Sequence, residues 1–213
     1  MLHEPTTVED AIEFHFRGGD APPGWVMRSS LMALGQHARE ETGRSLLTGE
    51  LEEEPKSGSW LGATAYLILL DQIGKSLKPL DAPNPAGPSP VERALQMWSD
   101  VNRQEQYVMS ALRNALAHDF ALSNLNKNNP AYQHRFTLDR HPSRLVEFPA
   151  EPWSGNYPSN RPDVTTVSLR VLGDLVEGVV AKVERESRSG NVEITLAGGP
   201  TELIYRYGIV HRE

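Results

Sequence analysis

The chain has 213 residues, of which 38% are hydrophobic and 23% charged, a composition typical of one large globular domain or of one and a half small ones. Its net charge of −7 argues against a large nucleic-acid-binding surface without excluding a small positive cleft, and the sequence contains no apolar run of the length needed to span a membrane. The absence of cysteine excludes disulfides, thiolate metal sites and cysteine nucleophiles, and together with an N-terminus unlike a signal peptide it predicts a cytoplasmic protein.

The first part of the chain predicts an N-terminal arm followed by two helices. Residues 1–24 end in a cluster of glycines and prolines and are expected to form a partly ordered arm. Apolar residues at helical spacing from about Trp25 predict a helix that ends between Gly43 and Gly49. The next helix is predicted from Trp60 to about Lys78. Because this helix is apolar nearly all round, we expect it at the centre of a bundle.

Two further helical segments are predicted after a proline-rich linker. Ser89 is a candidate N-cap, Pro90 suits the first helical position, and Glu92 would complete a capping box. The helical region that starts there is expected to run to about Gln104. A fourth segment, which continues the third or follows it closely, has an apolar stripe and fades near Leu122.

The last part of the chain predicts two β hairpins with a helix between them. Alternating segments at 134–138 and 144–148 are expected to pair as the first hairpin. Apolar spacings of three and four residues predict a helix over 164–186, in spite of the strand propensity of its valines. Segments 192–196 and 203–207 flank a Gly-Gly-Pro turn and are expected to form the second hairpin.

The predicted fold class is therefore mainly α: a helical bundle of four to five helices with small antiparallel β hairpins appended. The expected organisation is an N-terminal arm (1–24), a bundle core (25–122), a loop with a β hairpin (123–163), a C-terminal bundle helix (164–187) and a C-terminal β hairpin (188–213).

One short stretch of the fourth helical segment carries a polar trio among small apolar residues. Asn114 and His118 lie four residues apart and so share a helix face, on the same line as Tyr107 two turns earlier. Arg113 starts about 100° away round the helix, but its long side chain can reach the same edge. Burying such a trio unpaired is costly, so these residues are the candidates for chemistry.

The sequence Arg113-Asn114-Ala115-Leu116-Ala117-His118 resembles the motif of the HEPN superfamily of helical domains, many of which are metal-independent ribonucleases, toxins or defence proteins. That motif is an arginine, a polar residue that is often asparagine, and a histidine after four to six intervening positions. The resemblance covers roughly residues 25–122 together with the helix at 164–186. Two further arginine–histidine pairs, Arg135–His141 and Arg206–His211, lie in predicted strands or turns and lack the asparagine.

The resemblance implies an endoribonuclease that uses no metal and no cofactor. His118 would give or take a proton, Arg113 would bind the phosphate, and Asn114 would orient His118 or contact substrate. We assign Tyr107 and Asp119 as substrate-binding residues. RNA is the implied substrate, whose own 2′-OH is the nucleophile. The resemblance also implies a homodimer with the site at its cleft, and an antitoxin or other partner protein.

Two other functions fit the same residues. The motif could be a structural polar network in a non-catalytic dimerisation or interaction domain, with Arg113 paired to Asp119 or to Asp71. Alternatively, the domain could bind a nucleotide near Arg113. For Asp71, which lies in an apolar helical run, we favour a solvent-facing edge position over a role in orienting Arg113 or His118.

Overall fold

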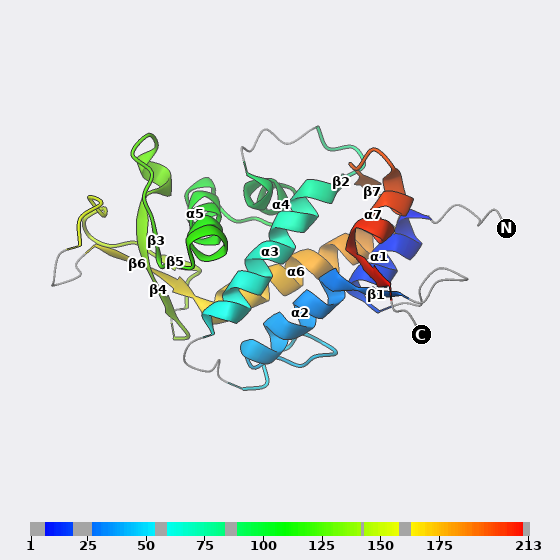
Figure 1. Cartoon of the computed structure of the whole chain (residues 1–213), viewed down its shortest axis with the longest axis horizontal. Coiled ribbons are helices and arrows are strands. Elements are labelled where there is room, and N and C mark those ends of the chain that lie inside the picture. Colours follow the sequence, from blue (N-terminus) through cyan, green and yellow to red (C-terminus); the bar gives the residue numbers. More distant parts are fainter. Residues whose placement is uncertain are drawn as a thin grey trace.

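The computed structural model describes residues 7–18, 27–53, 59–83, 89–141, 143–157 and 163–210. Its helices are α1 (Val8–Phe16), α2 (Ser30–Glu41), α3 (Trp60–Ser76), α4 (Pro90–Trp98), α5 (Arg103–Asp119), α6 (Leu169–Arg188), α7 (Gly199–Tyr207) and a short 3₁₀ helix, η1 (Pro130–Tyr132). Its strands are β1 (Met27–Ser29), β2 (Leu77–Pro79), β3 (Ser123–Asn124), β4 (His134–Asp139), β5 (Val146–Glu147), β6 (Val164–Ser168), β7 (Val192–Ile194) and β8 (Gly208–Val210). The fold is mixed α+β, with helices in the majority (Figure 1).

Helix α3 is the centre of the molecule, as its all-round apolar sequence predicted. It contacts α2, α4, α5 and α6, and residues on every side of it are buried (Figure 1). Gly74 permits the tightest of these contacts, because a Cβ there would lie 1.8 Å from the carbonyl oxygen of Pro90 at the start of α4. Helix α6 also contacts α3, and the buried residues of its apolar stripe, which include Leu172, Val176 and Val183, belong to the same core.

A mixed four-stranded sheet lies at one end of the molecule, next to α5 (Figure 1). Its strand order is β3-β4-β6-β5; β4 and β6 are parallel, and the other pairs are antiparallel. The predicted hairpin of 134–138 with 144–148 is therefore wrong, because β6 lies between β4 and β5. Residues 164–168 form this strand rather than the first turn of a helix. Its β-branched Val-Thr-Thr-Val run favours a strand, and Ser168 then caps α6.

The second predicted hairpin is also wrong. β7 pairs with β2, which follows α3 in sequence, and residues 199–207 form α7 with Pro200 in its first turn. The predicted arm contains α1, which begins at a capping box between Thr7 and Asp10. The pair β1–β8 joins the start of α2 to the end of α7. Small two-stranded pairs thus connect segments that are distant in the sequence.

The predicted third and fourth helical segments are separate helices, α4 and α5. Ser89 caps α4 as expected, since its Oγ accepts a hydrogen bond from the Glu92 backbone N–H at 3.2 Å. The Glu92 carboxylate does not complete a capping box; it accepts from the Tyr132 hydroxyl instead. Within the described ranges, no helix combines the length and apolar character that crossing a membrane requires.

Candidate active site

Helix α5 positions the three motif residues in its last two turns. The helix begins at Asn102, whose side chain accepts a hydrogen bond from the Glu105 backbone N–H at 3.1 Å. Its buried stripe, which includes Leu112 and Leu116, faces the core, so the opposite edge of the same turns is left near the surface. Arg113 is 19% exposed, and His118 is exposed one residue before the end of the helix.

The structure brings Arg113, Asn114 and His118 together. The Arg113 Nη1 donates to the Asn114 Oδ1 at 3.2 Å and lies 2.7 Å from the His118 Nε2. Because a guanidinium has donors only, the His118 Nε2 in this contact must be the acceptor and the ring must be neutral with its proton on Nδ1. The arginine therefore holds the nitrogen lone pair that a general base would use.

The other terminal nitrogen of Arg113 binds a buried carboxylate on α3. The Arg113 Nη2 lies 3.1 Å from the Asp71 Oδ1, and the second oxygen of Asp71 lies 2.5 Å from the Lys75 ammonium and accepts from the Gln72 amide at 3.1 Å. Asp71 is 1% exposed, so the solvent-facing position that we favoured is wrong. The alternative that pairs Arg113 with Asp71 is the observed one, and it fixes the guanidinium between α3 and α5.

The charges of this cluster sum to one excess positive charge at the surface. Asp71 is shared between Arg113 and Lys75, and Lys75 is 39% exposed. The ion pairs offset the desolvation of Asp71, which would be unfavourable alone. The Arg113 Nε is buried without a hydrogen-bond partner. A neutral imidazole beside a fixed guanidinium can accept a proton while the cation stabilises an adjacent anion.

The two predicted substrate-binding residues lie apart from the trio's hydrogen bonds. Asp119 is exposed at the end of α5, and the carboxylate that Arg113 contacts is that of Asp71. Tyr107 is about 10 Å back along the helix axis from Asn114, given a rise of 1.5 Å per residue. Its ring lies 5.0 Å from that of Tyr132, with the Arg103 guanidinium 4.7 Å from its centre.

Tyr107 thus belongs to a second cluster, centred on the fully buried Glu92. The Tyr132 hydroxyl donates to Glu92 at 2.8 Å, and Arg103 lies 3.3 Å from the other carboxylate oxygen. Burial, followed by the hydrogen bond to Glu92, raises the pKa of Tyr132 well above its ordinary value. These contacts join α4, α5 and η1, and they explain why α5 is held where its second half can present His118.

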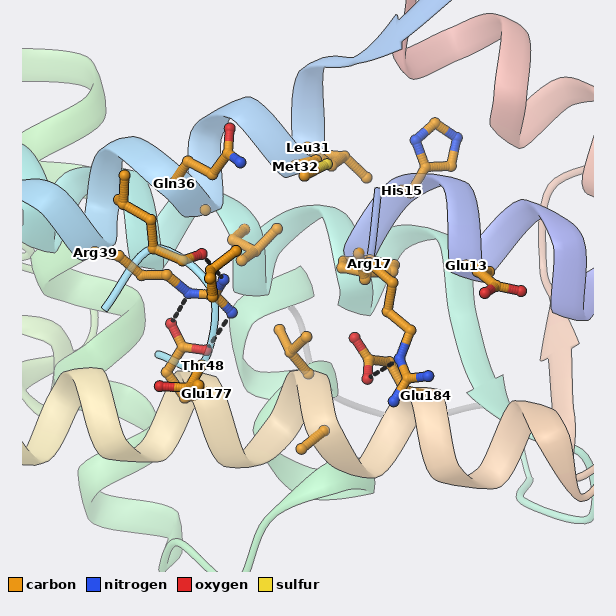
Figure 2. Close-up of a pocket in the computed structure, with 17 residues that line it drawn as sticks. Glu13, His15, Arg17, Leu31, Met32, Gln36, Arg39, Thr48, Glu177 and Glu184 are labelled. Atoms are coloured by element: carbon orange, nitrogen blue, oxygen red, sulfur yellow. Dashed lines mark hydrogen bonds and ion pairs between the residues drawn. The ribbon is translucent and has the colours of Figure 1, made fainter. Parts of the chain in front are cut away.

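A separate cleft of about 600 Å³ lies between α1, α2 and α6 (Figure 2). It is on the opposite side of α3 from the motif, because Leu69 lines the cleft and Asp71, two residues on, faces α5. Ion pairs connect its walls: Arg39 binds Glu177 through two nitrogens at 2.8 and 2.7 Å, and Arg17 binds Glu184 at 2.9 Å. Figure 2 shows both pairs reaching from α1 and α2 to α6.

Neither the motif nor the cleft offers a metal site in the described part of the chain, where no group of three or more histidine, aspartate or glutamate side chains is arranged to hold an ion. Comparisons of this chain with models of known protein families, with curated proteins and with solved structures find no match. The roles of Arg113, Asn114 and His118 stay predictions that rest on the residues and their geometry.

Sequence reasoning missed two parts of the neighbourhood. The first is Lys75, which lies one helical turn after Asp71; an acidic and a basic residue four apart in an apolar helix is a detectable pattern. The second is Phe120, which directly follows the helix in a left-handed conformation with φ of 50°. No sequence pattern predicts this conformation, because the position after a helix usually holds glycine or asparagine.

Proposed function

We propose that this protein is a HEPN-like, metal-independent endoribonuclease in which His118 is the acid/base group and Arg113 binds the scissile phosphate. The observation that carries the proposal is the 2.7 Å contact between the Arg113 guanidinium and the His118 Nε2 at the exposed end of α5. Buried ion pairing to Asp71 holds the guanidinium in place before substrate arrives. A preorganised cation of this kind stabilises charge that develops in a transition state.

The reaction follows from the chemistry of RNA. A phosphate oxygen displaces His118 as the acceptor of the Arg113 Nη1, which frees the His118 Nε2 to take the proton of the 2′-OH. The O2′–P bond forms and the P–O5′ bond breaks, which leaves a cyclic phosphate and a 5′-hydroxyl. The proton returns through solvent to the departing oxygen. Asn114, which accepts from Arg113, keeps the guanidinium aligned with the imidazole.

The proposal includes a homodimer. The resemblance to HEPN domains supports it, and so does the charge of the cluster. A single copy offers one excess positive charge on an acidic body, whereas two copies that meet near His118 would double the local field that an RNA backbone meets. Sedimentation of the purified protein measures the oligomeric state directly.

The test is cleavage of end-labelled RNA in the presence of EDTA. We expect wild-type protein to cleave and His118→Ala to lose about 100-fold or more of the rate, the usual contribution of a general acid or base. The matched control is His37→Ala, since the His37 side chain is 75% exposed on α2, and this variant should cleave at the wild-type rate. Product ends should be a cyclic phosphate and a 5′-hydroxyl.

Three results would count against the proposal. Equal cleavage by wild type and His118→Ala would assign the activity to another site or to a contaminant. No cleavage by either would remove the activity, and loss of cleavage in EDTA would remove the metal-independent mechanism. Because His118 is exposed, its substitution should leave the melting temperature unchanged, so loss of activity cannot be ascribed to unfolding.

A second candidate function is a non-catalytic interaction domain. The observation that favours it is that the Arg113 side chain is only 19% exposed and that both of its terminal nitrogens bind groups of the same chain. An arginine with a purely structural role would show the same features. In that case Arg113→Ala lowers the melting temperature by leaving Asp71 with one partner fewer, and no RNA cleavage exists for His118→Ala to remove.

A further inference from the structure

Phe120 is the anomalous residue of the site's surroundings. Among the described residues it is the only non-glycine with a positive φ, 50°, and yet 71% of it is exposed. A non-glycine residue in this region is strained, and such strain persists where the surrounding structure fixes it. Here most of the residue is exposed, and the ring contact that fixes it is with Trp60.

The backbone role of Phe120 does not need the ring either. Its N–H and that of Ala121 both bind the carbonyl of Ala115, at 3.1 Å in the second case, and so satisfy the end of α5. These are main-chain bonds that glycine would make without strain. The main-chain role of this position therefore does not account for the ring.

The ring is nevertheless held in one orientation. The centre of the Phe120 ring lies 5.2 Å from that of the Trp60 ring, and the two ring planes make an angle of 84°. This edge-to-face contact joins the end of α5 to the start of α3. Edge-to-face aromatic pairs are favourable and directional. An exposed ring that is braced from one side is suited to contact a flat partner from the other.

Phe120 also lies next to the proposed catalytic group. Only the exposed Asp119 separates it from His118, which limits the distance between the Cα atoms of Phe120 and His118 to about 7 Å. Arg113, which contacts His118, supplies positive charge on the same helix. Cations that bind phosphates beside an exposed aromatic ring are the combination by which proteins hold single-stranded nucleic acid.

We propose that Phe120 is a base-stacking platform: a nucleobase next to the scissile phosphate stacks on its ring, so the RNA is single-stranded where it is cut. This inference rests on the proposed ribonuclease function. A base inside a duplex is already stacked on its neighbours, so only an unpaired base reaches the ring.

The test measures binding of a fluorescent single-stranded RNA oligomer in which every ribose is 2′-O-methylated, so that it cannot be cleaved. Phe120→Gly should weaken binding by about tenfold or more, the effect of losing one stacked base. Its melting temperature should change little, because relief of backbone strain and loss of the Trp60 contact oppose one another. Phe120→Tyr, which keeps the ring, and Leu47→Ala, which alters a residue 91% exposed beside the separate cleft, should bind within about twofold of wild type.

An abasic oligomer sharpens the measurement. Removing the base that stacks should weaken RNA binding to the wild-type protein. It should leave binding to Phe120→Gly unchanged, because that variant already lacks the ring on which the base would stack. Equal affinity of wild type and Phe120→Gly would overturn the stacking proposal while RNA cleavage stood. If Phe120→Gly loses RNA binding only because a dimer dissociates, as sedimentation would show, the stacking proposal would also be overturned. The ring would then be a contact between two copies of the chain. If wild type neither binds nor cleaves RNA, the ribonuclease function itself fails.

Discussion

The two sides of α3 differ in how their charged groups are used. On the side of α1, α2 and α6 lies the cleft, where Glu177 accepts from Arg39 twice and from the Tyr66 hydroxyl at 2.9 Å. On the α5 side an imidazole lone pair and a guanidinium meet at the surface. The volume of a cavity and the availability of reactive groups are thus separate properties in this molecule.

The comparison assigns different work to the two arginines. Arg39 holds two walls of a cleft together, and the hydrogen bond with Glu177 raises its pKa further above its ordinary value. Arg113 has a similar ion pair with Asp71 through Nη2, but its Nη1 contacts Asn114 and His118 instead of a carboxylate. A phosphate can compete for that nitrogen more easily than for those of Arg39, whose contacts are bidentate.

The largest predicted effect is on RNA cleavage, and it tests whether the two sides of α3 differ in function. Arg113→Lys keeps a positive charge near Asp71 but removes the planar donor that reaches both His118 and a phosphate, so we expect RNA cleavage to fall by about 10²–10³-fold. Arg39→Lys is the matched substitution on the other side of α3 and should leave cleavage unchanged. An equal loss in the two variants, measured as initial rates, would mean that the cleft takes part in the reaction.

The helical part of this fold could be predicted because its cues are local. The all-round apolar sequence of α3 and the Ser89 cap of α4 each depend on neighbouring residues, and both expectations hold. The strand partners depend on distant segments. β2 follows α3 directly and pairs with β7 more than a hundred residues later, and nothing near Leu77 or Val192 indicates that register.

The site could be predicted to the same extent. The spacing of Arg113, Asn114 and His118 on one helix predicts that they meet, and they do. The buried partner Asp71 comes from another helix, and its burial could not be predicted because an aspartate is rarely fully buried unless it is paired. Only the packing of α3 against α5 shows that Arg113 lies within reach of it.

The second prediction concerns the cleft side of α3 and the dependence of stability on pH. His15, on the cleft side, donates from one ring nitrogen to the Leu203 carbonyl and binds the Ser29 hydroxyl with the other; burial lowers its pKa from 6.5 to about 4, although the Leu203 bond opposes the shift. Above pH 6.5 the His15 ring is neutral in both the folded and the unfolded protein, so it does not make the free energy of unfolding depend on pH. As pH falls from there to about 4, the unfolded chain binds a proton that the folded chain does not, so stability falls, by up to about 3 kcal/mol.

Urea unfolding of wild type and His15→Gln between pH 7.5 and 4 measures this effect. The variant should lose less stability than wild type over that range, since glutamine does not titrate and the other carboxyl and imidazole groups are common to both proteins. Parallel curves would show that His15 is protonated as easily in the folded protein as in the unfolded one, and would contradict its place as a fully desolvated group of the cleft wall.

The smallest expected effect tests whether the cleft's open volume matters at all. Gly35 lies within α2 and lines the cleft, and a Cβ there would be 3.9 Å from the Leu69 side chain, an ordinary contact. Gly35→Ala should therefore narrow the cleft, stabilise the protein by about 0.5–1 kcal/mol through helix propensity, and leave RNA cleavage unchanged. The same substitution at Gly74, where a Cβ would lie 1.8 Å from Pro90, should destabilise the fold instead. Melting curves and cleavage rates of Gly35→Ala decide the point: a more stable protein with lower activity would mean that the cleft must change shape during the reaction, and the division of work across α3 would not hold.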